Sequence, residues 1–360
     1  VGPAPVALGM EELISFRIEA SLGEASISAE ELTELMEAGV PFVRFRGEWI
    51  EVDPKEIRQV LKYMKRHEHG EMSAADWMRL EAEDEEDRLW KGMSVTGMET
   101  SGLLSSLMRG DVLRNLPERE VPEGLHGTLR PYQERGFQWL SALSGLGFGV
   151  CLADDMGLGK TVQVITCLLD RALNHPADQE RGPILILCPT SLLGNWQREL
   201  QRFAPSLTVH IHHGGRRVRG ESFLSLVESH DIVLTTYHLA GRDSEDLAGV
   251  KWSTVVLDEA QYIKNHRTKQ AQSVMKLSAP HRIAMTGTPV ENRLGELWSI
   301  FHFLNPGYLG TYHSFRQRYG SGEGGDRLKE LHRLVSPFLL RRLKSDPDIS
   351  KDLPEKLELK

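Results

Sequence analysis

The feature that most constrains the fold of this 360-residue chain is a short turn with two glycines and a lysine. The turn runs from Asp154 to Thr161, follows an apolar stretch at 148–153, and precedes an apolar, helix-like segment at 162–169. A buried strand, a glycine turn and a helix start can bind nucleotide phosphates, because free backbone N–H groups and the helix dipole favour an anion there. The turn therefore predicts an α/β fold with a nucleotide site.

Each position of the turn has an expected role. Glycine at 157 and 159 permits unusual φ values and brings the backbone close to phosphate oxygens. Lys160 is expected to reach the β- and γ-phosphates of ATP, and the Thr161 hydroxyl to bind Mg²⁺. The general phosphate-loop pattern has glycine where this chain has Asp154, so an ordinary strand-to-helix turn stays an alternative for this motif alone. The expected nucleotide contacts are Asp155, Met156, Gly157, Leu158, Gly159, Lys160 and Thr161.

A second nucleotide signature lies further along the chain, where the apolar run 255–257 ends in Asp258-Glu259-Ala260-Gln261. Acidic side chains at the C-terminal tip of a buried parallel strand lie where α/β sheets hold metal ions and catalytic groups. Asp258 is expected to bind Mg²⁺, and Glu259 to orient and deprotonate the attacking water. A solvated turn is the alternative, which the presence of both signatures disfavours. We therefore predict an ATP hydrolase with Lys160, Asp258 and Glu259 as catalytic residues.

The bulk composition is that of a soluble globular protein, with 40% hydrophobic and 26% charged residues. No apolar run approaches the roughly 20 residues that span a bilayer, so we expect no membrane association. Cys151, Cys167 and Cys188 lack metal-ligand spacing and are expected to be buried thiols in a reducing cytoplasm. Because the chain begins at Val1 rather than Met, we expect it to be part of a longer protein.

The net charge of −8 is unevenly distributed. Residues 1–127 contain 14 basic and 26 acidic residues, whereas residues 128–360 contain 29 and 25. The nucleotide-binding part is thus mildly basic, and nucleic-acid binding needs only a local positive surface. Candidate phosphate contacts, each also compatible with a solvated surface, are Arg216, Arg217, Arg219, Lys264, Arg267 and Lys269; Arg341 and Arg342 are expected to order a hinge rather than to steer DNA.

The chain divides by pattern into several parts. Residues 1–116 read as a small α+β accessory module, with a capping box at Ser28 and Glu31, a hairpin between 41 and 52, and a helix at 56–66. Residues 117–127 read as a linker, and from 128 strands and helices alternate, which predicts a parallel sheet with helices on both faces. The expected strands are Ile184–Cys188, Thr208–Ile211, Ile232–Thr235, Val255–Leu257 and Arg282–Met285, and later helices are expected at 294–304, 315–319 and 328–340.

The order of these motifs resembles the Swi/Snf family of superfamily-two ATPases, which includes chromatin remodellers and bacterial translocases. The resemblance covers about Leu129 to Leu359, and it includes an opening motif at 129–140. In this family the phosphate loop has the form Asp-x-Gly-x-Gly-Lys-Thr, which also lacks the first glycine. The region at 45–54 is similar to one that precedes the ATPase in bacterial members. Further similar stretches are Cys188–Trp196, Thr235–Tyr237, Asp258–Asn265, Thr286–Asn292 and Pro337–Arg342.

The resemblance implies further roles. Gln133 would read the adenine edge through a two-point amide contact. Thr286, Gly287 and Thr288 would couple the nucleotide state to the DNA side. Loops at the ends of two strands would contact the phosphates of one DNA strand through hydroxyls and helix N-terminal amides, which read no base sequence. The residues expected to do so are Thr190, Ser191, Asn195, Thr235, Thr236 and Tyr237.

The resemblance also implies a domain plan. Residues 128–310 would form a RecA-like ATP-binding lobe, 311–345 protruding helices, and 346–360 a hinge toward a second lobe. In such motors the second lobe supplies arginines to the γ-phosphate, and an arginine finger is worth about 10³–10⁵ in kcat in related NTPases. We therefore expect the isolated chain to bind nucleotide weakly and to hydrolyse it poorly.

The leading hypothesis is the ATP-binding lobe of a double-stranded-DNA-dependent ATPase and translocase that remodels or displaces protein–DNA complexes. We expect a monomeric, cytoplasmic, nucleoid-associated bacterial protein that binds the DNA backbone without sequence specificity. One alternative is a strand-separating DNA or RNA helicase, although RNA helicases carry Asp after Asp-Glu-Ala and Ser-Ala-Thr in place of Thr-Gly-Thr. Another is a nucleotide-gated module that binds a protein partner through residues 1–116.

Overall fold

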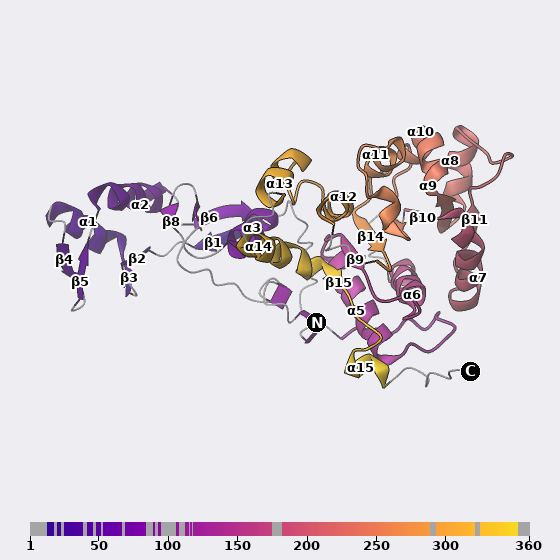
Figure 1. Cartoon of the computed structure of the whole chain (residues 1–360), viewed down its shortest axis with the longest axis horizontal. Helices are drawn as coiled ribbons and strands as arrows, with labels where there is room; N and C mark the ends of the chain where they lie inside the picture. The colour runs from indigo at the N-terminus through magenta and orange to yellow at the C-terminus, as the bar shows by residue number, and fades with distance from the viewer. Residues whose placement is uncertain are drawn as a thin grey trace. The chain divides into compact units, whose positions relative to one another are not determined.

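The computed structural model contains two compact units, one within residues 11–100 and one within residues 101–360 (Figure 1). The module and linker boundaries at 116 and 127 that the sequence suggests remain predictions. The described residues are 13–17, 20–22, 25–38, 42–45, 48–51, 53–66, 69–83, 89–90, 93–94, 106–107, 112–114, 116, 118–174, 182–288, 293–320 and 325–351. The expected hinge sequence after 351 and the stretch 289–292 lie outside them.

The N-terminal unit consists of antiparallel pairs of short strands and of helices. Its first helix begins with the expected capping box, in which the Ser28 N–H donates to Glu31 Oε2 at 2.9 Å and the Glu31 N–H donates to Ser28 Oγ at 3.1 Å. The expected hairpin between 41 and 52 is confirmed as β4 and β5. The elements are β1 (Leu13–Arg17), β2 (Ala20–Leu22), β3 (Ala25–Ile27), α1 (Ala29–Ala38), β4 (Phe42–Phe45), β5 (Glu48–Glu51), α2 (Pro54–Arg66), β6 (His69–Ser73), α3 (Ala74–Ala82), β7 (Leu89–Trp90) and β8 (Met93–Ser94).

The C-terminal unit contains a seven-stranded sheet in the order β11-β12-β10-β13-β14-β9-β15, in which every neighbouring pair is parallel. The strands expected from the apolar runs between 184 and 285 are confirmed. These runs do not alternate with polar residues because both faces of a helix-covered parallel sheet are buried. The strands are β9 (Val150–Leu152), β10 (Ile184–Cys188), β11 (Val209–Ile211), β12 (Ile232–Thr236), β13 (Thr254–Leu257), β14 (His281–Met285) and β15 (Leu339–Leu340).

Two layers of helices cover this sheet, as expected. Helix α6 packs against α5 and α7, and helix α11 packs against α9 and α12, while β14 is contacted by both α5 and α12. Each helix among the described residues is too short or too polar to cross a bilayer. The helices are α5 (Pro131–Gly145), α6 (Lys160–Leu173), α7 (Leu193–Phe203), α8 (Glu221–Glu228), α9 (Tyr237–Arg242), α10 (Ser244–Ala248), α11 (Lys269–Met275), α12 (Leu294–Leu304), α13 (Tyr312–Tyr319), α14 (Gly325–Val335) and α15 (Pro347–Ser350), with 3₁₀ turns at Val112–Arg114, Thr190–Leu192, Ala260–Ile263 and Ser336–Phe338.

One expectation at the C-terminal end is wrong. The segment 328–340 reads as a helix, but α14 ends at Val335 and a 3₁₀ turn that contains Pro337 follows. Proline has no backbone N–H to donate and its ring obstructs the preceding turn, so the α-helix stops there. The chain then enters β15, which pairs parallel with β9 at the edge of the sheet. Part of the expected protruding segment 311–345 therefore belongs to the sheet.

The three cysteines are free thiols, and each is buried as expected. Cys151 and Cys188 lie in strands β9 and β10, which both have a strand on either side, and Cys167 lies in α6. Burial raises the pKa of Cys151 to about 12 and that of Cys188 to about 12. Cys151 and Cys188 are therefore protonated thiols that act as small core residues.

Candidate active site

The phosphate loop has the backbone conformation that its glycines predict. Gly157 and Gly159 have φ values of +85° and +76°, in the left-handed region that other residues rarely adopt. A Cβ at Gly159 would also overlap the Gln133 amide, so space as well as φ requires glycine there. Helix α6 begins directly after the loop, at Lys160, and places a positive helix N-terminus against it. This geometry fits a bound triphosphate.

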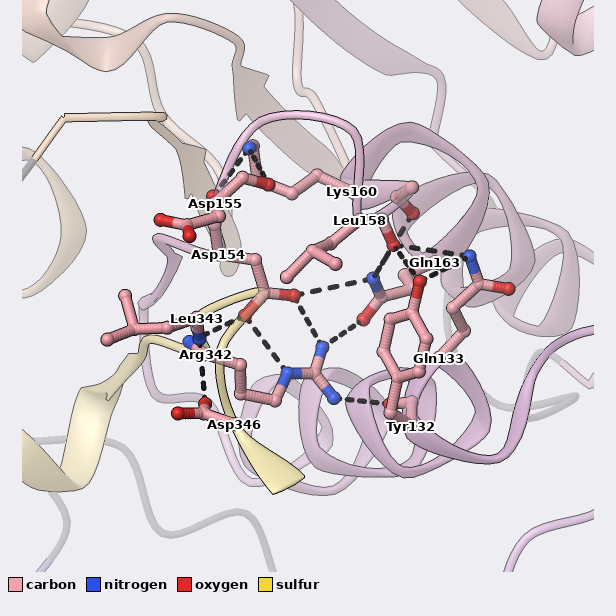
Figure 2. Close-up of polar contacts among 11 residues, drawn as sticks. Tyr132, Gln133, Asp154, Asp155, Leu158, Lys160, Gln163, Arg342, Leu343 and Asp346 are labelled. Carbon is pink, nitrogen blue, oxygen red and sulfur yellow. Dashed lines mark hydrogen bonds and ion pairs between the residues drawn. The ribbon is translucent and has the colours of Figure 1, made fainter. Parts of the chain in front are cut away.

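Lys160 lies where the sequence motifs converge. Its Nζ donates to the main-chain oxygen of Asp154 at 2.6 Å (Figure 2). Burial lowers the pKa of the Lys160 ammonium group, and nearby carboxylates, those of Asp258 and Glu259 among them, oppose this shift. The expected coupling residues 286–288 are also close, because a Cβ at Gly287 would lie 3.9 Å from Lys160 Nζ. The structure thus brings the phosphate loop and the two acids into one site.

Asp258 is held in place at the end of β13 by two donors. Trp196 Nε1 donates to Asp258 Oδ2 at 2.8 Å, and the Glu259 N–H donates to Asp258 Oδ1 at 2.8 Å. Burial raises the pKa of the Asp258 carboxyl, and the hydrogen bond from Trp196 opposes that rise. An oriented carboxylate is the ligand type that Mg²⁺ prefers, so this donor set fits the ion.

Glu259 has a strained backbone. Its φ of 51° and ψ of 56° lie in the left-handed region, and it is the one non-glycine residue with positive φ in the described part of the chain. Such conformations cost about 1–3 kcal/mol and occur mainly at functional sites. Gln261 Nε2 donates to Glu259 Oε2 at 2.5 Å, and Thr286 Oγ1 donates to Gln261 Oε1 at 3.0 Å. Hydrogen bonds therefore join the expected base to Thr286, the first residue of the expected coupling motif.

The remaining expected nucleotide contacts stay predictions. Thr161 is partly exposed in the first turn of α6, and Met156 is 72% exposed in the loop. Gln133 Oε1 accepts from the Arg130 N–H at 2.9 Å, and its Nε2 donates to Leu158 O at 3.2 Å. Gln133 thus ties the start of α5 to the phosphate loop. Its Nε2 also donates to the Tyr132 hydroxyl at 3.5 Å, so Oε1 keeps one free lone pair and an adenine contact through Nε2 would replace one of these two bonds.

The expected DNA contacts separate into two groups. Thr190 and Ser191 are exposed in the turn that follows β10, and Asn195 is partly exposed one turn later, so their polar groups are accessible. The side chains of Thr235, Thr236 and Tyr237 are buried, so their hydroxyls are not exposed to DNA here, and their expected contact with DNA stays a prediction. Their partners are internal: Thr235 Oγ1 donates to His212 O at 3.0 Å, Thr236 Oγ1 accepts from Leu239 N at 3.3 Å, and Tyr237 OH donates to Asp258 O at 2.6 Å.

Of the three arginines that follow strand β11, Arg217 is structural. Its guanidinium donates to Asp243 at 2.5 and 2.9 Å, and the side chain is only 5% exposed. His212 Nε2 also contacts this carboxylate, at 3.0 Å. The hydrogen bond from Arg217 is the main reason that the pKa of Asp243 falls to about 2. Arg217 is therefore not free to contact DNA.

The basic residues after the second signature lie on a different surface. Lys264 and Arg267 line a cavity of about 610 Å³ together with Arg316 from α13. Its other described lining residues include two histidines, a tyrosine and an asparagine, and none is acidic. No ion pair is recorded for these three cations within the described residues. The cavity is therefore a positively charged surface suited to phosphate groups.

Three side-chain contacts of this site were not predicted from the sequence. Trp196 holds Asp258, and Gln163 and Arg342 contact Asp154, the residue that replaces the first glycine of the general pattern. Trp196 offers a weak signal, because the N–H of a buried tryptophan needs an acceptor. Nothing in the sequence pairs position 342 with position 154.

We expect Trp196→Phe to make ATP turnover more sensitive to acid. Without the indole donor the pKa of Asp258 rises further, and Mg²⁺ requires the carboxylate, so the acid limb of the pH profile moves to higher pH. Loss of a hydrogen bond to a charged group predicts a roughly tenfold decrease in turnover at the acidic end. The measurement is kcat/KM for ATP against pH. Trp298→Phe is the matched control, since that indole donates to Gly310 O instead; equal profiles for the wild type and Trp196→Phe would contradict the assignment.

Comparisons with known proteins agree with this geometry. The profile of the SNF2-related domain matches residues 132–360, and a profile described as SNF2 Helicase protein matches residues 2–82. The chain is 43% identical to YwqA of Bacillus subtilis (strain 168), whose name describes an ATP-dependent helicase/translocase. That match covers 98% of this chain and 39% of YwqA. This chain is also 38% identical to the TATA-binding protein-associated factor MOT1 of Saccharomyces cerevisiae, over 66% of this chain and 14% of MOT1.

Solved structures show the same likeness. The Sulfolobus solfataricus SWI2/SNF2 ATPase core in complex with dsDNA matches with a TM-score of 0.59 and 43% identity, over 66% of this chain and 49% of that one. The core domain alone matches with a TM-score of 0.57 and 44% identity, over 65% of this chain and 47% of that one. These matches confirm the expected RecA-like α/β fold. The chain spans about two fifths of YwqA and about half of the Sulfolobus chain.

Proposed function

Because this chain belongs to the SNF2-related family of ATPases, we propose that it is the ATP-binding lobe of a double-stranded-DNA-dependent translocase that remodels or displaces protein–DNA complexes. The observation that carries the proposal is the convergence of Lys160, Asp258 and Glu259 on one site at the C-terminal ends of β9 and β13. In parallel α/β sheets this edge is where ligands bind.

The residues of the site divide the work of hydrolysis. Lys160 and the loop N–H groups would hold the phosphates of ATP, and Asp258 and Thr161 would hold Mg²⁺. Mg²⁺, when bound, neutralises charge on the β- and γ-phosphates. Glu259 would accept a proton from the attacking water, and the hydrogen bond of 2.5 Å from Gln261 Nε2 would orient its carboxylate.

Two observations support duplex DNA as the partner. The Sulfolobus core that this chain resembles was solved with double-stranded DNA. In this chain, Thr190 and Ser191 are exposed, and Lys264, Arg267 and Arg316 line a cavity whose described lining includes no acidic residue. Hydroxyls and cations of this kind contact phosphates and read no base sequence. The same features support binding of the DNA backbone rather than of particular sequences.

The test is ATP turnover by the full-length protein with duplex DNA, single-stranded DNA or RNA. We expect duplex DNA to raise kcat most, with the DNA concentration for half-stimulation rising steeply with salt. Equal or greater stimulation by RNA would reject the proposal and favour the helicase alternative.

One variant connects this test to the basic cavity. Arg267→Ala should weaken duplex binding to a similar extent for all sequences and reduce the slope of log K against log[salt] by about 1. Lys276→Ala changes an exposed lysine at the opposite end of α11; it is the matched control and should leave the slope unchanged. An unchanged slope for Arg267→Ala would remove this cavity from the DNA surface.

A further inference from the structure

A buried carboxylate stands where the general phosphate loop has its first glycine. Asp154 is fully buried directly after β9, and both of its oxygens bind one arginine from the far end of the chain (Figure 2). Asp154 Oδ1 accepts from Arg342 Nε at 3.0 Å and from the Arg342 N–H at 3.1 Å, while Oδ2 accepts from Arg342 Nη2 at 2.5 Å. This is a bidentate ion pair in which Asp154 is fully buried and the Arg342 side chain is 11% exposed.

The same guanidinium holds two other elements of the nucleotide site. Arg342 Nη2 donates to Gln163 Oε1 of α6 at 2.6 Å, and Nη1 donates to Tyr132 O of α5. The Tyr132 ring lies 5.4 Å from the guanidinium carbon, and its hydroxyl donates to Leu158 O of the loop at 3.0 Å. A Cβ at Gly136 would overlap Gln163 and Arg342, so glycine there leaves room for the network.

The main chain around Arg342 is bonded to the loop as well. Asp155 N–H donates to Arg342 O at 3.0 Å, and Lys344 N–H donates to Asp155 Oδ2 at 3.1 Å. Further along, Ile349 packs in a buried cluster with Tyr132 and Leu158. The phosphate loop therefore has two sides. One presents Lys160 and the loop amides to the nucleotide, and the other is bonded to residues 340–349.

Lys160 connects the nucleotide site to this arrangement. Lys160 Nζ now donates to Asp154 O at 2.6 Å and to Asp155 O at 3.3 Å. A phosphate that accepts from the ammonium group competes with the two carbonyls for its three N–H donors. Asp154 and Asp155 are also bonded to Arg342, so Lys160 on one side of the loop and Arg342 on the other share the same two partners.

A contribution to the folding stability of the protein is a weak explanation for a buried ion pair between Asp154 and Arg342. Replacing a buried ion pair with apolar side chains is often neutral or stabilising, although removing only one partner is costly. We propose that the Asp154–Arg342 pair is a conformational link in which Arg342 acts as a positioning residue, connecting the state of the phosphate loop to the segment 343–351. The proposal rests on nucleotide binding at the proposed site.

The first test compares three variants of the full-length protein at saturating ATP. Arg342→Lys keeps the positive charge but loses the planar guanidinium that binds the carboxylate through two hydrogen bonds. The double variant Asp154→Leu/Arg342→Met removes both charges together. We expect both to melt within a few degrees of the wild type and to bind ATP with less than about threefold change in Kd. We expect DNA-stimulated kcat to fall about tenfold or more, with KM for ATP nearly constant. Arg242→Lys, an exposed arginine at the end of α9, is the matched control.

Wild-type kcat in both folded variants would overturn the link and show that the pair only holds the sheet edge. A second measurement needs no variant: hydrogen exchange of residues 339–351 in the wild type, with and without a non-hydrolysable ATP analogue. We expect the analogue to change exchange in this segment, and unchanged exchange with the analogue bound would overturn the proposal. An absence of DNA stimulation in the wild type would instead reject the proposed function, which distinguishes the two failures.

Discussion

Glu259→Gln is expected to lower ATP turnover by about 10²–10⁴-fold, the usual contribution of a positioned general base. Glutamine keeps the shape of the side chain but cannot accept a proton from water. Nucleotide affinity should remain within a few-fold of the wild type, because Lys160 and the loop amides are unchanged. Single-turnover hydrolysis and the Kd of a fluorescent ATP analogue measure the two effects separately.

Glu228→Gln is the matched control, an equal change of charge at an exposed position on α8. It should leave both turnover and affinity unchanged. Near-normal hydrolysis by Glu259→Gln would show that another group activates the water, and the hydrogen bond from Gln261 to Glu259 would then have only a structural role.

Lys160→Ala is expected to reduce ATP affinity by about 10–100-fold, because each charge-assisted hydrogen bond to phosphate contributes about 1.5–3 kcal/mol. Turnover should fall as well, since the ammonium group lies beside both acids. The change also removes the donor to Asp154 O, so the melting temperature should be measured alongside the Kd of ATP.

Lys276→Ala provides the control for loss of a lysine from this unit. A comparison with ADP sharpens the test, because Lys160 is expected to reach the γ-phosphate and the loss of affinity should be larger for ATP. Equal affinities of Lys160→Ala and the wild type for ATP would place the triphosphate elsewhere.

Much of the nucleotide site could be predicted because its signals are local. Gly157 and Gly159 adopt positive φ, which the turn required, and the strands from Ile184 to Met285 follow continuous apolar runs. The acids at 258 and 259 follow directly from the strand that ends at Leu257. In each case the local conformation is determined by residues that lie close together in the sequence.

The missed features depend on contacts between distant parts of the chain. The partner of Asp154 is Arg342, and the apolar pair at 339–340 becomes a strand because β9 offers an open edge. Thr235 and Tyr237 carry hydroxyls that suit a DNA contact, but burial turns them inward. Composition and spacing do not encode which surfaces are covered, so these residues required the tertiary structure.

The late position of β15 has a consequence for synthesis on the ribosome. β9 ends at Leu152, but the strand that covers its edge ends at Leu340. At about 5–20 residues per second, translation leaves roughly 10–40 s between the two. During that interval the nascent lobe exposes an unpaired strand edge and an acid without its arginine, a state prone to pairing with other chains. The lobe can complete its sheet only when nearly all of it has left the ribosome.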